Sequence, residues 1–184
     1  MDTFNPEMIH AAKRNIDITV LVHNNHVFGL TTGQTTPTSN KGYKSKSTPF
    51  GNIEDPLNPL ALSLVSGASF VARGFAGDLN HLKELIIAGM QHKGFALIDV
   101  LQPCVTFNNT FKLYREKTYK LENHDSSNMK ATLEKTYETD KIPIGIFYQV
   151  DKPVYRDGIE QLSKGPLVKQ KLQVDINKLI GKLR

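Results

Sequence analysis

Short apolar segments alternate along the chain with stretches of helical periodicity, and this alternation restricts the possible folds more than any other feature. The segments with the composition of buried strands are residues 16–22, 69–75, 95–101 and 144–150. The expected helices occupy residues 6–14, 58–68, 77–94, 109–121 and 127–139. Strands that alternate with helices of about 10 to 15 residues predict an α/β domain with a mostly parallel sheet and helices on both faces.

Residue types at the helix ends support these assignments. Asn58 before Pro59 is a typical start of a helix, and Asp78 is expected to cap the helix after it. Gly94 follows the last turn of that second helix, whose apolar face is predicted to consist of Leu79, Leu82, Leu85, Ile86 and Met90. The apolar run at 16–22 is nearly continuous, so we expect a strand covered on both faces.

Composition excludes several classes of protein. The chain has 184 residues, enough for one domain with a core of its own, and 23 basic residues against 18 acidic ones. No basic stripe interleaved with aromatic residues occurs, so we expect no nucleic-acid partner. A single cysteine is typical of a reducing cytoplasm, and no apolar run approaches the ~20 residues of a membrane span. We therefore expect a soluble, cytoplasmic protein.

Two polar segments follow expected strands directly, HNNHVFGLTTGQ at 23–34 and QPCVTFN at 102–108. Ligands of parallel sheets collect beyond the carboxyl ends of the strands. The Asn25 side chain and the Val27 carbonyl could offer oxygens to magnesium, and Gly29 and Gly33 would let the backbone approach a phosphate. The residues thus suggest a diphosphate-binding loop, while an ordinary polar loop remains an alternative.

The order of three longer segments is more specific than any one motif. These segments are IHAAKRNIDITVLVHNNHVFGLTTGQTTPTS, PLALSLVSGASFVARGFAGDLNHL and HKGFALIDVLQPCVTFNN. Over roughly residues 8–150 the chain resembles the β subunit of the 2-oxoacid:ferredoxin oxidoreductases, especially the 2-oxoglutarate type. The resemblance implies a thiamin diphosphate-binding fold over 1–150, with its N-terminal part missing, and a C-terminal extension over 151–184.

The resemblance also implies roles for individual residues. Asn25 matches the side-chain ligand of magnesium, Val27 the backbone carbonyl ligand, and Gly29, Leu30 and Thr31 match residues beside the cofactor diphosphate. Cys104 matches the last of four cysteines that hold a 4Fe-4S cluster, for which thiolates are the expected ligands.

The activity that the resemblance implies is oxidative decarboxylation of a 2-oxoacid, with 2-oxoglutarate the favoured substrate. Coenzyme A takes the acyl group, and the cluster passes electrons to ferredoxin. The family's active site lies between two chains, so the resemblance implies an α subunit as a partner.

Two features of the family pattern are missing from this chain. The Gly-Asp-Gly segment that supplies the acidic magnesium ligand would fall just before residue 1, and the other three cluster cysteines do not occur. We expect the chain to be catalytically silent by itself, with thiamin diphosphate as its cofactor and with magnesium and the 4Fe-4S cluster bound only if another chain supplies the missing ligands. The alternatives are a non-catalytic protein that only binds other subunits, or an incomplete gene product.

Three further interpretations stay open. His23 and His26 could form a zinc site with Cys104, although their spacing has no zinc-finger pattern. Asp99 lies in a strand that is expected to be buried, where structural pairing is favoured over acid–base catalysis. The cluster at Lys41, Lys44 and Lys46 is typical of a solvated loop, with contact to ferredoxin or to coenzyme A phosphates as the alternative.

Overall fold

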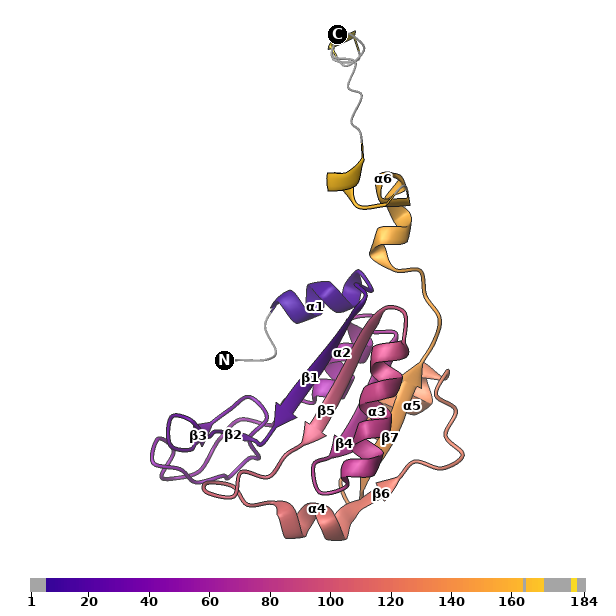
Figure 1. Cartoon of the computed structure of the whole chain (residues 1–184). Helices are drawn as coiled ribbons and strands as arrows, with labels where there is room; N and C mark the ends of the chain where they lie inside the picture. The colour runs from indigo at the N-terminus through magenta and orange to yellow at the C-terminus, as the bar shows by residue number, and fades with distance from the viewer. Residues whose placement is uncertain (1–5, 164, 171–179, 182–184) are drawn as a thin grey trace.

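The computed structural model describes residues 6–163, 165–170 and 180–181, and a twisted sheet forms its centre (Figure 1). The sheet has five strands in the order β1-β5-β4-β7-β6. Their bounds are Ile18–Asn24 for β1, Phe70–Phe75 for β4, Phe95–Leu101 for β5, Thr118–Lys120 for β6 and Ile142–Gln149 for β7. Strands β1, β5 and β4 are mutually parallel, whereas β7 runs antiparallel to β4 and parallel to β6. The predicted α/β class with a mostly parallel sheet is confirmed.

Helices cover both faces of the sheet, as predicted (Figure 1). The helix α3 (Leu79–Gln91) packs on one face, and α1 (Pro6–Lys13), α2 (Pro59–Val65) and α5 (Met129–Thr136) pack on the other. The remaining helical segments are α4 (Phe111–Lys117), α6 (Glu160–Ser163) and the 3-10 turns η1 (Tyr155–Gly158) and η2 (Leu167–Lys169). The expected caps are present, because Asn58 Oδ1 accepts from Ala61 N and Asp78 Oδ1 accepts from His81 N, each at 3.2 Å.

Strand β5 shows why the sequence folds this way, since all seven of its residues are buried. Successive side chains of a strand point to opposite faces. Ile98 accordingly joins the cluster around Leu85 of α3, and Leu97 joins the cluster around Leu60 of α2. An unbroken apolar strand is therefore stable here only because helices cover both of its faces.

Two expectations about burial are wrong. Strand β1 lies at the edge of the described sheet and is half-exposed, with Ile18 at 43% and Leu21 at 38%. In α3, Leu79 and Met90 are 72% and 71% exposed because they lie in the first and last turns, and the helix centre makes the contact with the sheet. Apolar composition alone does not separate an edge strand from a central one.

The polar segment after β1 contains a short hairpin that the sequence did not predict. It pairs β2 (Val27–Phe28) with β3 (Gln34–Thr35) in an antiparallel ladder. Thr32 and Gly33 in the connecting turn have φ values of 78° and 96°. The chain then runs across the strand ends, where Leu57 N donates to Pro37 O at 2.8 Å.

The sequence also failed to predict strand β6 and the direction of β7. The predicted boundary at residue 150, between the cofactor-binding domain and the C-terminal extension, remains a prediction. No helix within the described ranges has the length and apolarity that crossing a bilayer requires.

Candidate functional site

The segments that follow β1 and β5 meet at the carboxyl end of the sheet, as the sequence predicted. Parallel pairing of the two strands sets Asn24 opposite Leu101. Beyond the ladder, Gln102 N donates to Asn24 O at 3.1 Å, and Asn108 Nδ2 donates to Asn25 O at 3.1 Å. The two candidate segments therefore form one hydrogen-bonded unit.

Asn25 and Val27 lie in a tight turn at the start of β2. Asn25 Oδ1 accepts from Val27 N, and Val27 O accepts from Gly29 N, both at 3.1 Å. Each is a neutral carbonyl oxygen with two lone pairs, one of which the turn uses. Such oxygens suit magnesium when phosphate, water or carboxylate oxygens complete the coordination. The turn thus fits part of a magnesium site.

The acidic part of such a site is not found near this turn. The described residues include no group of three or more His, Cys, Asp or Glu side chains able to hold a metal ion. The zinc site of His23, His26 and Cys104, an alternative that the sequence disfavoured, is therefore not found among these residues. Both histidines are used locally, because His23 Nδ1 pairs with Gln102 Oε1 and His26 Nδ1 donates to Thr38 O, each at 2.5 Å.

Gly29, Leu30 and Thr31 begin the connection between β2 and β3, where Gly29 is half-buried and the other two are exposed. The Leu30 side chain is 99% exposed, and Thr31 Oγ1 donates to Gln34 Oε1 at 2.6 Å. A Cβ atom at Gly29 would lie 3.5 Å from Cys104 Sγ and 3.7 Å from Asn25 Nδ2. The residues that the resemblance assigned to metal, diphosphate and cluster thus lie side by side.

Cys104 is a free, half-buried thiol at one end of a tight turn. Cys104 N donates to Asn108 O at 3.1 Å, and Asn108 N donates back to Cys104 O at 2.9 Å. The Tyr43 hydroxyl donates to Phe107 O at 3.0 Å, and burial, followed by the nearby Cys104 charge, raises the pKa of Tyr43. Since the chain has one cysteine and a cubane cluster takes four thiolates, the chain does not fit a 4Fe-4S cluster unaided.

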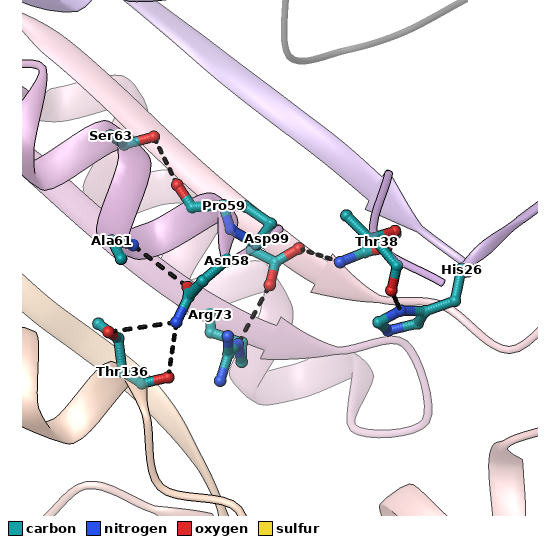
Figure 2. Close-up of polar contacts among 10 residues, drawn as sticks. His26, Thr38, Asn58, Pro59, Ala61, Ser63, Arg73, Asp99 and Thr136 are labelled. Carbon is teal, nitrogen blue, oxygen red and sulfur yellow. Dashed lines mark hydrogen bonds and ion pairs between the residues drawn. The ribbon is translucent and has the colours of Figure 1, made fainter. Parts of the chain in front are cut away.

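A buried polar network supports the segment from the sheet side (Figure 2). Asp99 is fully buried; its Oδ2 accepts from Arg73 Nε and its Oδ1 accepts from Asn24 Nδ2, both at 3.1 Å. Asn24 Oδ1 in turn accepts from Thr38 Oγ1 at 2.8 Å. The predicted structural pairing of Asp99 is confirmed. The network joins β4 and β5 to Asn24 and, through Thr38, to His26, the residues on either side of Asn25.

Arg73 is the site residue that sequence reasoning missed. It lies in the buried strand β4, with a side chain only 10% exposed. A guanidinium in such a strand needs an anion beside it, and Asp99 in the neighbouring strand is the obvious candidate.

Of the surface lysines, Lys41 pairs with Asp55 at 3.0 Å and both remain exposed, which agrees with a solvated loop.

The chain matches two family models. "Thiamine pyrophosphate enzyme, C-terminal TPP binding domain" matches residues 1–100. The model for the C-terminal region of the pyruvate ferredoxin oxidoreductase beta subunit matches residues 104–164. These ranges contain the Asn25–Thr31 segment and Cys104, respectively.

Curated relatives agree with the family models. A 2-oxoacid:ferredoxin oxidoreductase subunit beta from Sulfolobus sp is 46% identical, over 83% of this chain and 55% of the relative. A 2-oxoglutarate synthase subunit KorB from Methanocaldococcus jannaschii is 33% identical, over 85% of this chain and 58% of the relative. The chain therefore spans a little over half the length of these relatives.

A solved structure shares the fold. It is the 2-oxoglutarate:ferredoxin oxidoreductase from Magnetococcus marinus with 2-oxoglutarate, coenzyme A and succinyl-CoA bound. The match has a TM-score of 0.87 and 33% identity, and it covers 97% of this chain and 62% of that one. Because the first family model covers more than half of the residues, this chain belongs to the thiamine pyrophosphate enzymes, and its homologues are β subunits of 2-oxoacid:ferredoxin oxidoreductases.

Proposed function

We propose that the chain forms the diphosphate-binding part of the β subunit of a cytoplasmic 2-oxoacid:ferredoxin oxidoreductase that acts on 2-oxoglutarate. The observation that supports this most is the contact of three assigned positions. Gly29 lies against both Cys104 Sγ and the Asn25 side chain, so the cofactor and the cluster would be neighbours. Electrons leaving the cofactor would then have a short path to the cluster.

Within this proposal, Asn25 Oδ1 and the Val27 carbonyl are magnesium ligands, and the turn at Gly29, Leu30 and Thr31 lies beside the diphosphate. Bound thiamin diphosphate supplies the electron sink for decarboxylation, and the protein supplies orientation and electrostatics. Two neutral oxygens balance none of the ion's charge, so an acidic ligand from outside the described residues is part of the proposal.

Cys104 has a narrower role in the proposal. Its thiolate is one ligand of a 4Fe-4S cluster whose other three thiolates come from elsewhere in the assembly. No reaction step is assigned to Cys104 itself. The α subunit, ferredoxin and coenzyme A are the proposed partners, and the match to a structure holding 2-oxoglutarate and coenzyme A supports the choice of substrates.

An assay of the complex of this chain with the α subunit and with the chain that supplies the missing acidic and cysteine ligands tests this function. The preparation is given thiamin diphosphate, magnesium, coenzyme A and a viologen dye, and we expect dye reduction with 2-oxoglutarate that exceeds reduction with pyruvate. The chain by itself is expected to reduce no dye. Reduction by the isolated chain, or a complex that prefers pyruvate, would contradict the proposal.

The exposed apolar side chains at the same end of the sheet favour a second candidate. Leu30, Phe50 and Val105 are 99%, 98% and 76% exposed, which is typical of a surface that another chain covers. A non-catalytic protein that only binds the α subunit would use this surface and need no cofactor. It predicts a stable complex whose melting temperature does not respond to thiamin diphosphate.

A further inference from the structure

A pocket of about 210 Å³ lies beneath the segment that crosses the carboxyl ends of β4 and β5. Asn24, Thr38, Asn58, Arg73 and Asp99 line its polar side. Asn25, Val27, Gly29 and Cys104 are not among its lining residues, so the pocket is separate from the proposed diphosphate and cluster positions.

The Arg73 side chain is the charged group with unused donors in this pocket. A guanidinium carries five N–H groups, and Asp99 takes the one on Nε. Within the part of the chain that the structure describes, Nη1 and Nη2 have no hydrogen-bond acceptor, and the remaining contact of the group is with the face of Phe147 at 5.6 Å. Figure 2 shows the end of the guanidinium directed away from Asp99.

Asp99 fixes the guanidinium without using its end. Each of the two carboxylate oxygens accepts one hydrogen bond, Oδ2 from Arg73 Nε and Oδ1 from Asn24 Nδ2. The two outer nitrogens form a fork whose geometry matches the two oxygens of a carboxylate. Among the described residues, the buried side-chain atoms without a partner are His81 Nδ1 and Thr110 Oγ1, so the outer Arg73 nitrogens are open to the pocket, where an acceptor group of a ligand can reach them.

The other lining groups limit what that acceptor can be. Apart from Asp99 and Arg73, the titratable residues in the lining are His26 and Tyr137, and His26 Nδ1 donates to Thr38 O. The remaining walls include the apolar residues Pro56, Leu57, Pro59 and Leu101. Arg73 is the one permanently charged cation among the lining residues, so a second negative charge on the ligand would have no cation to pair with, which is unfavourable.

We propose that this pocket binds a short-chain monocarboxylate, with the carboxylate on Nη1 and Nη2 of Arg73 and the carbon chain against Leu57, Pro59 and Leu101. The volume is below the range of ~300–1,000 Å³ that is typical of drug-sized ligands, so a molecule of a few carbon atoms fits best. The ligand would lie next to Asn24 and His26, the residues on either side of Asn25.

Calorimetric titration with sodium butyrate, at constant ionic strength and without thiamin diphosphate or magnesium, tests this site. We expect saturable binding with a Kd on the order of 1 mM, and at least about tenfold weaker binding to Arg73→Lys, which keeps the charge beside Asp99 but loses the fork.

A second variant tests the pocket without changing the ion pair. Leu57→Trp should fill the pocket and weaken butyrate binding to a similar extent, whereas Val65→Trp, at an exposed position of α2, should bind like the wild type. Inorganic phosphate should bind more weakly than butyrate. Absence of saturable butyrate binding to the wild type, unchanged binding in both pocket variants, or tighter binding of phosphate would overturn the assignment. None of these outcomes depends on the proposed oxidoreductase function.

Discussion

The side-chain oxygen of Asn25 accepts a hydrogen bond from the backbone N–H of Val27 at 3.1 Å. This bond fixes the two proposed magnesium ligands relative to each other, because one ligand is the bonded oxygen and the other is the carbonyl of the bonded residue. Ligands that are ordered before binding lose less conformational freedom when the ion arrives. The turn therefore holds the two proposed magnesium ligands in place before the ion binds, even without the acidic ligand.

The ion pair of Arg73 and Asp99 should be needed as a pair. Arg73→Met leaves a fully buried carboxylate without its cation and is expected to lower the free energy of unfolding by about 3–5 kcal/mol. The double variant Arg73→Met/Asp99→Asn removes both charges and keeps an oxygen for Asn24, so it should be more stable than Arg73→Met alone. Urea unfolding of the two variants checks this, and a double variant that is less stable than the single one would argue against the pairing.

Gly94 should tolerate no side chain, because it has a φ of 130° and lies against buried polar atoms. A Cβ atom there would come within 2.5 Å of Asn15 Oδ1 and 2.8 Å of Ser69 Oγ. Asn15 Oδ1 accepts from Ser69 Oγ at 2.6 Å and from Phe95 N at 2.8 Å, so the clash would disturb the start of β5.

We expect Gly94→Ala to lower the free energy of unfolding by more than about 1 kcal/mol. Gly158→Ala is the matched control, since a Cβ at Gly158 meets no atom within 4 Å, and its effect should stay within about 0.5 kcal/mol. Equal effects of the two substitutions in thermal or urea unfolding would show that the Gly94 contacts do not matter.

The cap of α3 should make a pH-dependent contribution to stability. The His81 backbone N–H, and then Lys120, lower the pKa of Asp78 below its ordinary value of 3.8. A carboxylate whose pKa is lowered on folding stabilises the fold above its unfolded pKa, and this stabilisation is lost as the pH falls through the folded pKa. Asp78→Ala should therefore cost about 1 kcal/mol near neutral pH.

The comparison of wild type with Asp78→Ala isolates this residue from the other carboxylates. Urea midpoints at about pH 6 and about pH 3 should show a difference that shrinks at the lower pH. A difference that stays constant between the two conditions would assign the effect of Asp78 to something other than its charge.

Local signals in the sequence were sufficient for part of the fold. The seven residues of β5 are those predicted, and the caps at Asn58 and Asp78 occur because a short polar side chain before a helix satisfies a free backbone N–H. Strand β6 has three residues and is held by its pairing with β7, so its own sequence carries little strand signal. The same holds for the two-residue strands of the hairpin.

The site was predictable in position but not in its connections. That the segments after β1 and β5 meet follows from parallel pairing and could be inferred from chain order. The link of Asp99 to Arg73 depends on β4 being the neighbour of β5, and strand order is a property of the whole chain. The exposure of Leu21 has the same origin, since it depends on β1 lying at the edge of the described sheet.

The response of the complex of this chain, the α subunit and the chain that supplies the acidic ligand to thiamin diphosphate and magnesium tests the central claim most directly. At a ligand concentration of about 100 times Kd, binding stabilises a protein by about 2.7 kcal/mol, which amounts to a rise of several degrees in melting temperature. We predict this rise for the wild type and for Asn80→Ala, an exposed asparagine of α3, and its loss in Asn25→Ala. An equal rise in Asn25→Ala, or no rise in the wild type, would contradict the account.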